Sequence, residues 1–147
     1  MTKLELGDQL VSYDTEAAVA AYSQMSNGGA ERCGCAYCRK FIPQRARAYP
    51  AEFLTLLSRL GIDFTKEGEV FHYGPSKDGS QLYGGWFYFV GRLIEAGRRA
   101  KTERAAFESG FRYWFSESFP RPPRFFGKNV AALEFVTRVL GELKESP

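Results

Sequence analysis

The hydrophobic periodicity of the chain changes near Glu69, and this change constrains the fold more than any other feature. Upstream, apolar residues recur at helical spacing, most clearly between Pro50 and Leu60. Downstream, aromatic and β-branched residues form runs interrupted by glycine and proline. Their connections lack a clear crossover helix, which favours antiparallel pairing. We therefore predict an α+β fold with N-terminal helices packed on a mainly antiparallel, aromatic-rich β-sheet.

The helices can be placed from their capping residues. Asp14 suits the start of a first helix, which Gly28 and Gly29 would stop. The clearest helix spans Pro50–Leu60, since proline fits the first turn and Gly61 follows the last apolar position. This helix is expected to cover one face of the sheet. Shorter features are a helical turn at Cys38–Ile42 and a polar connection at Arg45–Arg47.

The strands follow from alternation and turn residues. Gly84, Gly85 and Gly91 are expected to mark bulges or bends within one long strand. Asn129–Leu143 fits a helix and a strand equally well. The predicted strands are Leu4–Tyr13, Glu69–Tyr73, Gln81–Ile94 and Phe107–Ser116, with a turn at Ser76–Ser80, a polar connection at Glu95–Arg104 and a proline-rich loop at Phe119–Gly127.

Length and composition indicate a single domain spanning residues 1–147, large enough to fold without a metal or a disulfide. The N-terminal residues include acids and no apolar core, unlike a secretory signal. No stretch reaches the roughly 20 apolar residues of a membrane span. Because the number of cysteines is odd, a disulfide framework is not favoured. We expect a cytoplasmic protein without a membrane partner.

All three cysteines, Cys33, Cys35 and Cys38, fall within six positions, and the chain has a single histidine, His72. Three thiolates and one imidazole could form a tetrahedral zinc site. The CxxC spacing lets one tight turn aim two sulfurs at one ion. His72 lies more than thirty residues later, in a predicted strand, so the fold would have to bring it close to the cysteines. A site closed by these four ligands would be structural.

Two other interpretations of the cysteines stay open. A CxxC pair at a helix start, with Arg39 and Lys40 beside it, suits the reactive thiol of a small enzyme. Cysteines also pack as small hydrophobic residues. No phosphate-binding loop, nucleophile elbow or HExxH pattern is present, and no carboxylate stands out as a partner for His72. These absences favour a protein that is not an enzyme.

Aromatic residues, 16% of the chain, gather with arginines in the C-terminal half. Residues 75–147 carry 12 basic and 8 acidic side chains, a net charge of +4, whereas residues 1–74 carry a net charge of −1. Such residues stack nucleobases and hold phosphates, and they also anchor protein interfaces. Rings that pack the sheet core are the simpler interpretation. The candidate binding residues are Trp86, Tyr88, Arg92, Arg112, Trp114, Arg121 and Arg124. The rings of Trp86, Tyr88 and Trp114, together with Phe125 and Phe126, are expected to be partly exposed. This expectation holds if the core-facing residues are Phe87, Phe89, Phe111, Tyr113 and Phe115.

Four segments resemble a small uncharacterised bacterial family. They read Cys33-Gly34-Cys35-x-x-Cys38-Arg39-x-Phe41, Tyr49-Pro50-x-x-Phe53-Leu54-x-Leu56-Leu57-x-x-Leu60-Gly61-Ile62-Asp63, Lys66-x-x-Glu69-Val70 and Tyr83-x-Gly85-Trp86. The resemblance covers Cys33 to Phe135. It implies a strand at Ala132–Val139 and transfers no catalytic residue.

The sequence therefore predicts a bacterial, cytoplasmic, non-enzymatic domain that binds another macromolecule, with a protein as the favoured partner. The cysteine cluster and His72 would hold zinc. Binding of a nucleic acid or anionic ligand by the C-terminal half is the alternative, and a small thiol enzyme is the second alternative.

Overall fold

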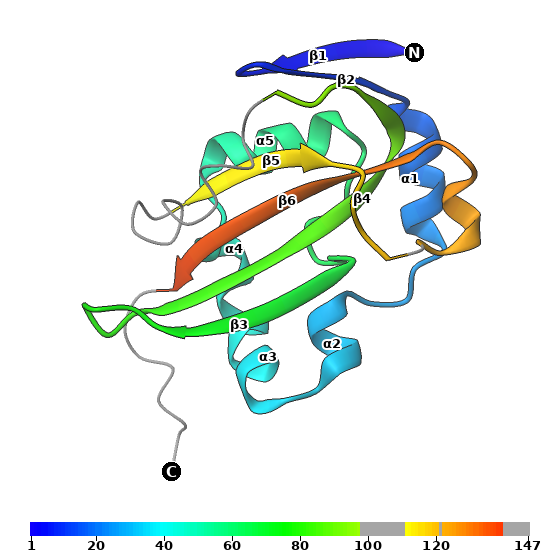
Figure 1. Cartoon of the computed structure of the whole chain (residues 1–147). Helices are drawn as coiled ribbons and strands as arrows, with labels where there is room; N and C mark the ends of the chain where they lie inside the picture. The colour runs from blue at the N-terminus through cyan, green and yellow to red at the C-terminus, as the bar shows by residue number, and fades with distance from the viewer. Residues whose placement is uncertain (98–110, 121, 140–147) are drawn as a thin grey trace.

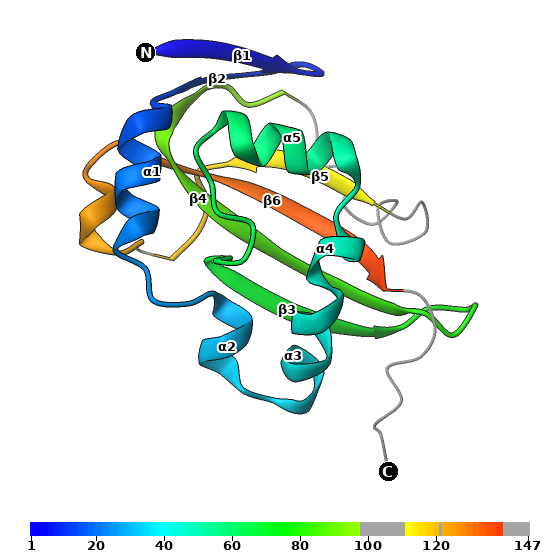
Figure 2. The same cartoon turned by 180° about the vertical axis from the view of Figure 1, so that it is seen from behind.

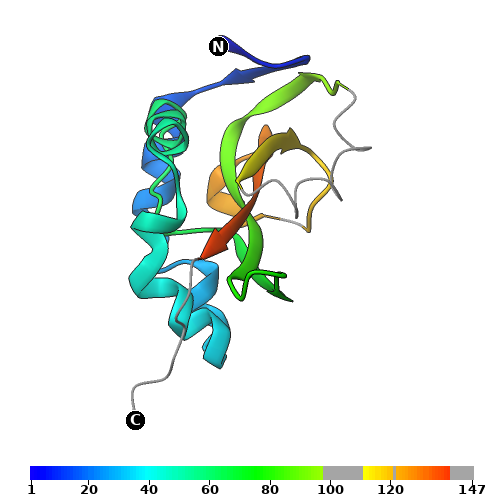
Figure 3. The same cartoon turned by 90° about the vertical axis from the view of Figure 1, so that its left-hand side faces the viewer.

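The computed structural model describes residues 1–97, 111–120 and 122–139, and it confirms the α+β class. Helices form one layer and an antiparallel sheet forms the other, as the side view in Figure 3 shows. The helices are α1 Thr15–Ser23, α2 Gly29–Cys33, α3 Ala36–Phe41, α4 Arg45–Ala48 and α5 Ala51–Arg59, with 3-10 turns η1 Ile42–Gln44 and η3 Arg124–Phe126. The strands are β1 Thr2–Leu6, β2 Gln9–Tyr13, β3 Glu69–Pro75, β4 Gln81–Glu95, β5 Arg112–Ser116 and β6 Val130–Val139 (Figure 1).

The long strand β4 organises the sheet. The strand order is β1-β2-β4-β6-β5, and β3 also pairs with β4. The first part of β4 pairs with β3 and its last part with β2, while β6 runs along its other edge. The predicted bend glycines permit this close pairing. A Cβ atom on Gly85 would lie 2.1 Å from the Glu69 carbonyl oxygen, and one on Gly91 would lie 2.0 Å from that of Ser12.

A buried glutamine links β2 to the far end of the sheet. The side-chain amide of Gln9 donates to the Phe115 carbonyl oxygen at 2.9 Å and to that of Ala96 at 2.8 Å. The backbone N–H of Phe115 donates back to Gln9 Oε1 at 2.8 Å. This amide therefore gives β5 the hydrogen bonds that a neighbouring strand would give, and it ties the curled sheet together.

Aromatic rings fill the space between the helices and the sheet. Figure 2 shows the molecule from the side on which the helices cover the sheet. Helix α5 lies over the sheet as predicted, and its Phe53 is fully buried. The Phe53 ring packs at centroid distances of 5.1 Å from Tyr113 and 6.1 Å from Phe135. Such ring pairs add to the free energy gained from burying their area. Tyr49 also contacts this cluster, at 5.7 Å from Phe87.

Several local predictions were wrong. The N-terminal run is a hairpin and not one strand, because Gly7 turns the chain at a φ of 57°. The first helix already ends at Ser23, and Gly28 instead precedes α2. The polar connection at Arg45–Arg47 is the helix α4. The ambiguous C-terminal segment is a strand through Val139, as the resemblance implies, because its backbone pairs with β4.

Some predictions fall on parts of the chain outside the described residues. These are the connection beyond residue 97, the start of the strand predicted from Phe107, and residues 140–143. In the described ranges, no helix combines the length and apolarity needed to cross a membrane.

The ring cluster predicts a strong asymmetry between two identical substitutions. Phe53→Ala should lower the free energy of unfolding by about 3–5 kcal/mol, because it removes a fully buried ring. Phe125→Ala, which removes a ring that is 38% exposed, should cost less than about 1 kcal/mol. Urea denaturation followed by tryptophan fluorescence measures both. Equal costs for the two variants would contradict this assignment of the core.

Candidate metal centre

The cysteines lie on a helix–turn–helix formed by α2 and α3. Helix α2 ends at Cys33, and Gly34 reverses the chain with a φ of 67°, a conformation that glycine adopts without strain. Cys35 then caps the N-terminus of α3, and its Sγ accepts the Cys38 backbone N–H at 3.4 Å. Residues 29–41, here called the cysteine hairpin, thus bring three sulfurs to one turn.

The three sulfur atoms all lie within 4.8 Å of one another. In a tetrahedral zinc site with Zn–S bonds of about 2.3 Å, neighbouring sulfurs lie about 3.8 Å apart. The cluster therefore needs only small side-chain movements to hold a metal ion. Cys38 is buried, whereas Cys33 and Cys35 are exposed, so the cluster opens to solvent on one side.

The cysteines differ in how readily they ionise. The hydrogen bond from the Cys38 backbone N–H, together with a smaller effect of the Cys33 side chain, lowers the pKa of Cys35 to about 7. Burial raises the pKa of Cys38, and so do its hydrogen bonds with the other two sulfurs. Cys35 therefore ionises more readily than the buried Cys38. A metal ion would displace the remaining protons.

The structure places His72 beside the cysteine hairpin, on β3. Its ring stacks on Tyr37 with centroids 3.8 Å apart and planes at 13°. Its Nε2 hydrogen-bonds to Gln81 Oε1 at 2.7 Å. Across the described ranges, the ligand atoms that meet around the cluster are three sulfurs, with no imidazole or carboxylate among them. His72 therefore packs against Tyr37 of the cysteine hairpin. Its predicted role as a fourth metal ligand stays a prediction.

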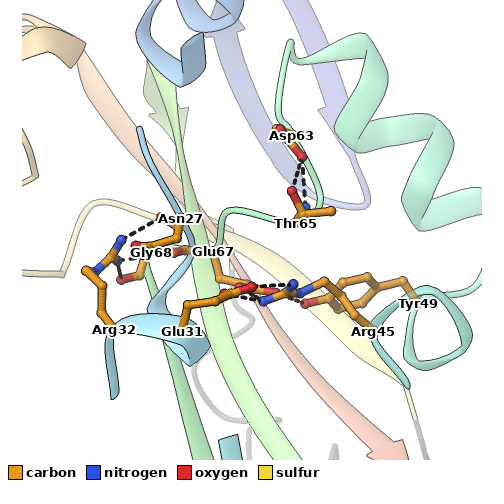
Figure 4. A network of polar contacts seen from close by, with 9 residues as sticks. All are labelled: Asn27, Glu31, Arg32, Arg45, Tyr49, Asp63, Thr65, Glu67 and Gly68. Atoms are coloured by element: carbon orange, nitrogen blue, oxygen red, sulfur yellow. Dashed lines mark hydrogen bonds and ion pairs between the residues drawn. The ribbon is translucent and has the colours of Figure 1, made fainter. Parts of the chain in front are cut away.

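A buried ionic network at the base of the hairpin was not predicted (Figure 4). The Arg45 guanidinium donates to the Glu67 carboxylate at 2.6 and 2.9 Å. It also donates to the Glu31 carboxylate at 2.8 and 3.0 Å. The Tyr49 hydroxyl donates to Glu67 at 3.2 Å. Glu67 is fully buried, so one guanidinium joins α2, α4 and the segment before β3.

Position in the network sets the ionisation of each acid. Burial raises the pKa of Glu67 and that of Tyr49. The hydrogen bonds from Arg45 lower the pKa of Glu31, which keeps partial contact with solvent. No sequence pattern pairs residues 22 and 14 positions apart, which explains why the network was missed.

Arg32 fastens the same helix at a second point. Its guanidinium donates to the backbone carbonyl oxygens of Asn27 and Gly68, both at 2.8 Å. Glu31 and Arg32 directly precede Cys33, so both side chains anchor the end of α2 that carries the first sulfur (Figure 4). The hairpin is therefore held in place by contacts that need no metal.

The predicted exposure of the candidate rings was largely wrong. Trp86 and Tyr88 are only 8% and 6% exposed. Phe71 packs on Trp86 at 5.3 Å, and Phe119 and the buried Phe126 pack on Tyr88 at 5.3 and 5.7 Å. The alternation along β4 correctly placed Trp86 and Tyr88 on the sheet face opposite to Phe87 and Phe89. It could not show that Phe71, Phe119 and Phe126 cover that face. Trp114 is half-buried and Phe125 is exposed. The residues expected to face the core are buried at Phe87, Phe89 and Phe115 and half-buried at Phe111 and Tyr113.

The candidate arginines in the described residues lie on three different elements, Arg92 on β4, Arg112 on β5 and Arg124 on η3. Arg92 is exposed and pairs with Glu117 at 3.1 Å. Arg112 and Arg124 are exposed, and Arg121 lies outside the described residues. Arg124 lines a groove of about 560 Å³ together with Phe119, Pro122, Pro123, Gly127, Lys128 and Val130.

Comparison of the chain with protein-family models, curated proteins and solved structures returned no match. The inferences about function that follow therefore come from the chain's own residues.

The ionic network predicts a pH-dependent stability. Glu31→Gln should lower the free energy of unfolding at pH 7 by about 1 kcal/mol, since a charge-assisted pair is lost at a partly exposed position. The folded-state pKa of Glu31 lies below its ordinary value of 4.5, so its contribution is complete above that value. The contribution disappears as the pH falls through the folded-state pKa.

Urea denaturation of wild type and variant between pH 7 and pH 3 measures this difference. The matched control is Glu117→Gln, which breaks the exposed Arg92–Glu117 pair and should cost less than about 0.5 kcal/mol. A difference for Glu31→Gln that grows as the pH falls would contradict the assignment.

Proposed function

We propose that the protein binds a zinc ion through the thiolates of Cys33, Cys35 and Cys38. The observation that carries this proposal is the meeting of three sulfurs within 4.8 Å on one short hairpin. Thiolates are soft ligands that zinc prefers over the oxygen donors suited to calcium and magnesium. The hydrogen bond from the Cys38 backbone N–H to Cys35 Sγ supports the proposal, because it stabilises a thiolate at rest.

The metal would organise a surface rather than hold the fold together. The aromatic core and the Arg45 network stabilise the hairpin without it. The proposed role is therefore that of a non-enzymatic domain whose hairpin contacts another macromolecule, with a protein as the favoured partner. Tyr37, 47% exposed, and the exposed Arg39 lie between and beside the ligands, and Tyr and Arg are common anchors of protein interfaces. The proposal includes a reducing, cytoplasmic setting, where thiols stay available to a metal.

Zinc content tests the metal proposal directly. Protein purified without added metal and then loaded with zinc should retain about one equivalent after desalting, measured by elemental analysis. Cys35→Ser and Cys38→Ser should each lose most of it, because two thiolates hold zinc far less tightly than three. Tyr37→Phe is the control, since it preserves all three sulfurs and the ring on His72. Retention below about 0.1 equivalent, with three freely titrating thiols, would refute the proposal.

Binding of an anionic macromolecule is a second candidate function. The groove beside η3 supports it, because exposed Arg124 and Lys128 line it together with the ring of Phe119. Backbone phosphates attract such cations, and rings stack on bases. Burial of Trp86 and Tyr88 removes two of the rings first expected to contribute, so this candidate is the weaker one.

A salt titration tests the groove. A single-stranded oligonucleotide should bind with an affinity that falls steeply with salt, and Arg124→Ala with Lys128→Ala should reduce the log–log slope by about 1.4, since each phosphate contact contributes about 0.7. Lys3→Ala with Arg47→Ala, which removes two exposed cations elsewhere, should leave the slope almost unchanged. Absence of binding at low salt would exclude this function.

A further inference from the structure

We propose that the fourth coordination position of the metal is open and takes an external thiolate. This inference rests on the proposed zinc site and adds its ligand class. The external thiol would lose its proton to solvent as its sulfur replaces a metal-bound water, so the step is a ligand exchange without oxidation or reduction. The thiolate comes from a small free thiol, because all three cysteines of a second copy of this chain already serve as ligands in its own site.

The number of ligands is the first argument. Zinc in proteins is almost always four-coordinate, and a site with three protein ligands leaves one position for water or another ligand. In the parts of the chain that the structure describes, the group around the cluster contains only the sulfurs of Cys33, Cys35 and Cys38. The hairpin thus resembles an open site in its ligand number.

Exposure is the second argument. An ion bound to three sulfurs directs its fourth bond away from the plane that they define. Cys38 lies on the buried side of the hairpin, while Cys33 and Cys35 lie in solvent. A ligand from outside can therefore approach the ion past the two exposed cysteines.

The position of His72 is the third argument. Its ring is held face to face with Tyr37 and tilted against Tyr83, with centroids 3.8 and 5.1 Å away. Its Nε2 is engaged with Gln81 at 2.7 Å. The Tyr83 hydroxyl in turn donates to the Tyr37 carbonyl oxygen at 2.8 Å, which fixes the ring pair beside the hairpin. Coordination through Nε2 would have to break its hydrogen bond with Gln81.

A basic side chain at the rim offsets the negative charge that an incoming thiolate brings. Three thiolates and Zn²⁺ leave one negative charge, and a fourth thiolate adds another. Arg39 lies at the rim, where its Nη1 donates to the Gly34 carbonyl oxygen at 2.6 Å, between Cys33 and Cys35. Its guanidinium offsets part of the added charge and can pair with a carboxylate on the incoming thiol.

Cobalt spectroscopy tests the proposal on the full chain. Co²⁺ bound in place of zinc gives sulfur-to-metal charge-transfer absorption, and its visible bands report the ligand set. Reduced glutathione should shift these bands with a saturable dependence, while S-methylglutathione, whose sulfur carries no ionisable proton, should not. His72→Gln should show the same spectrum as wild type before the thiol is added, and the same shift after it. Arg39→Gln should raise the half-saturating glutathione concentration about two- to fivefold.

Each other outcome has a definite meaning. A changed spectrum for His72→Gln, together with a wild type that ignores glutathione, overturns the proposal, because the imidazole then fills the fourth position. No response to glutathione in either protein also overturns it, since water then stays bound. A wild type without charge-transfer absorption refutes the zinc site itself, a failure distinct from the others.

Discussion

The geometry of the cysteine hairpin depends on one buried guanidinium. Arg45 pairs with Glu67 and Glu31 at once, and so connects α4, the segment before β3 and the helix that carries Cys33. Breaking a buried pair by removing one partner costs about 3–5 kcal/mol, because the remaining charge stays away from water. Burial raises the pKa of Glu67, whereas the hydrogen bonds from Arg45 lower that of the more exposed Glu31.

This arrangement separates folding from metal chemistry. Phe53, Tyr49 and their neighbours form a core that needs no metal ligand. Arg45 and Arg32 hold the cysteine hairpin against the segment before β3. A site assembled on a rigid support loses little conformational freedom when an ion binds. A metal ion held in the proposed site could then exchange its external ligand while the fold stays intact.

Long, strongly periodic elements could be predicted from the sequence, and short or long-range features could not. Helix α5 and strand β4 have enough residues for their periods to show. Helices α2, α3 and α4 span four to six residues, too few for a clear helical period. The meeting of three sulfurs followed from their spacing, but the stack of His72 on Tyr37 depends on where β3 lies. Burial of Trp86 depends on Phe71, which the alternation within one strand cannot reveal.

The amide of Gln9 has a further consequence for how the protein behaves at high concentration. A strand at the edge of a sheet offers unpaired N–H and C=O groups, to which a strand of another molecule can add. At Phe115 both groups are already occupied by a side chain of the same molecule. Gln9 thus works as a built-in barrier against intermolecular strand addition at this point of β5.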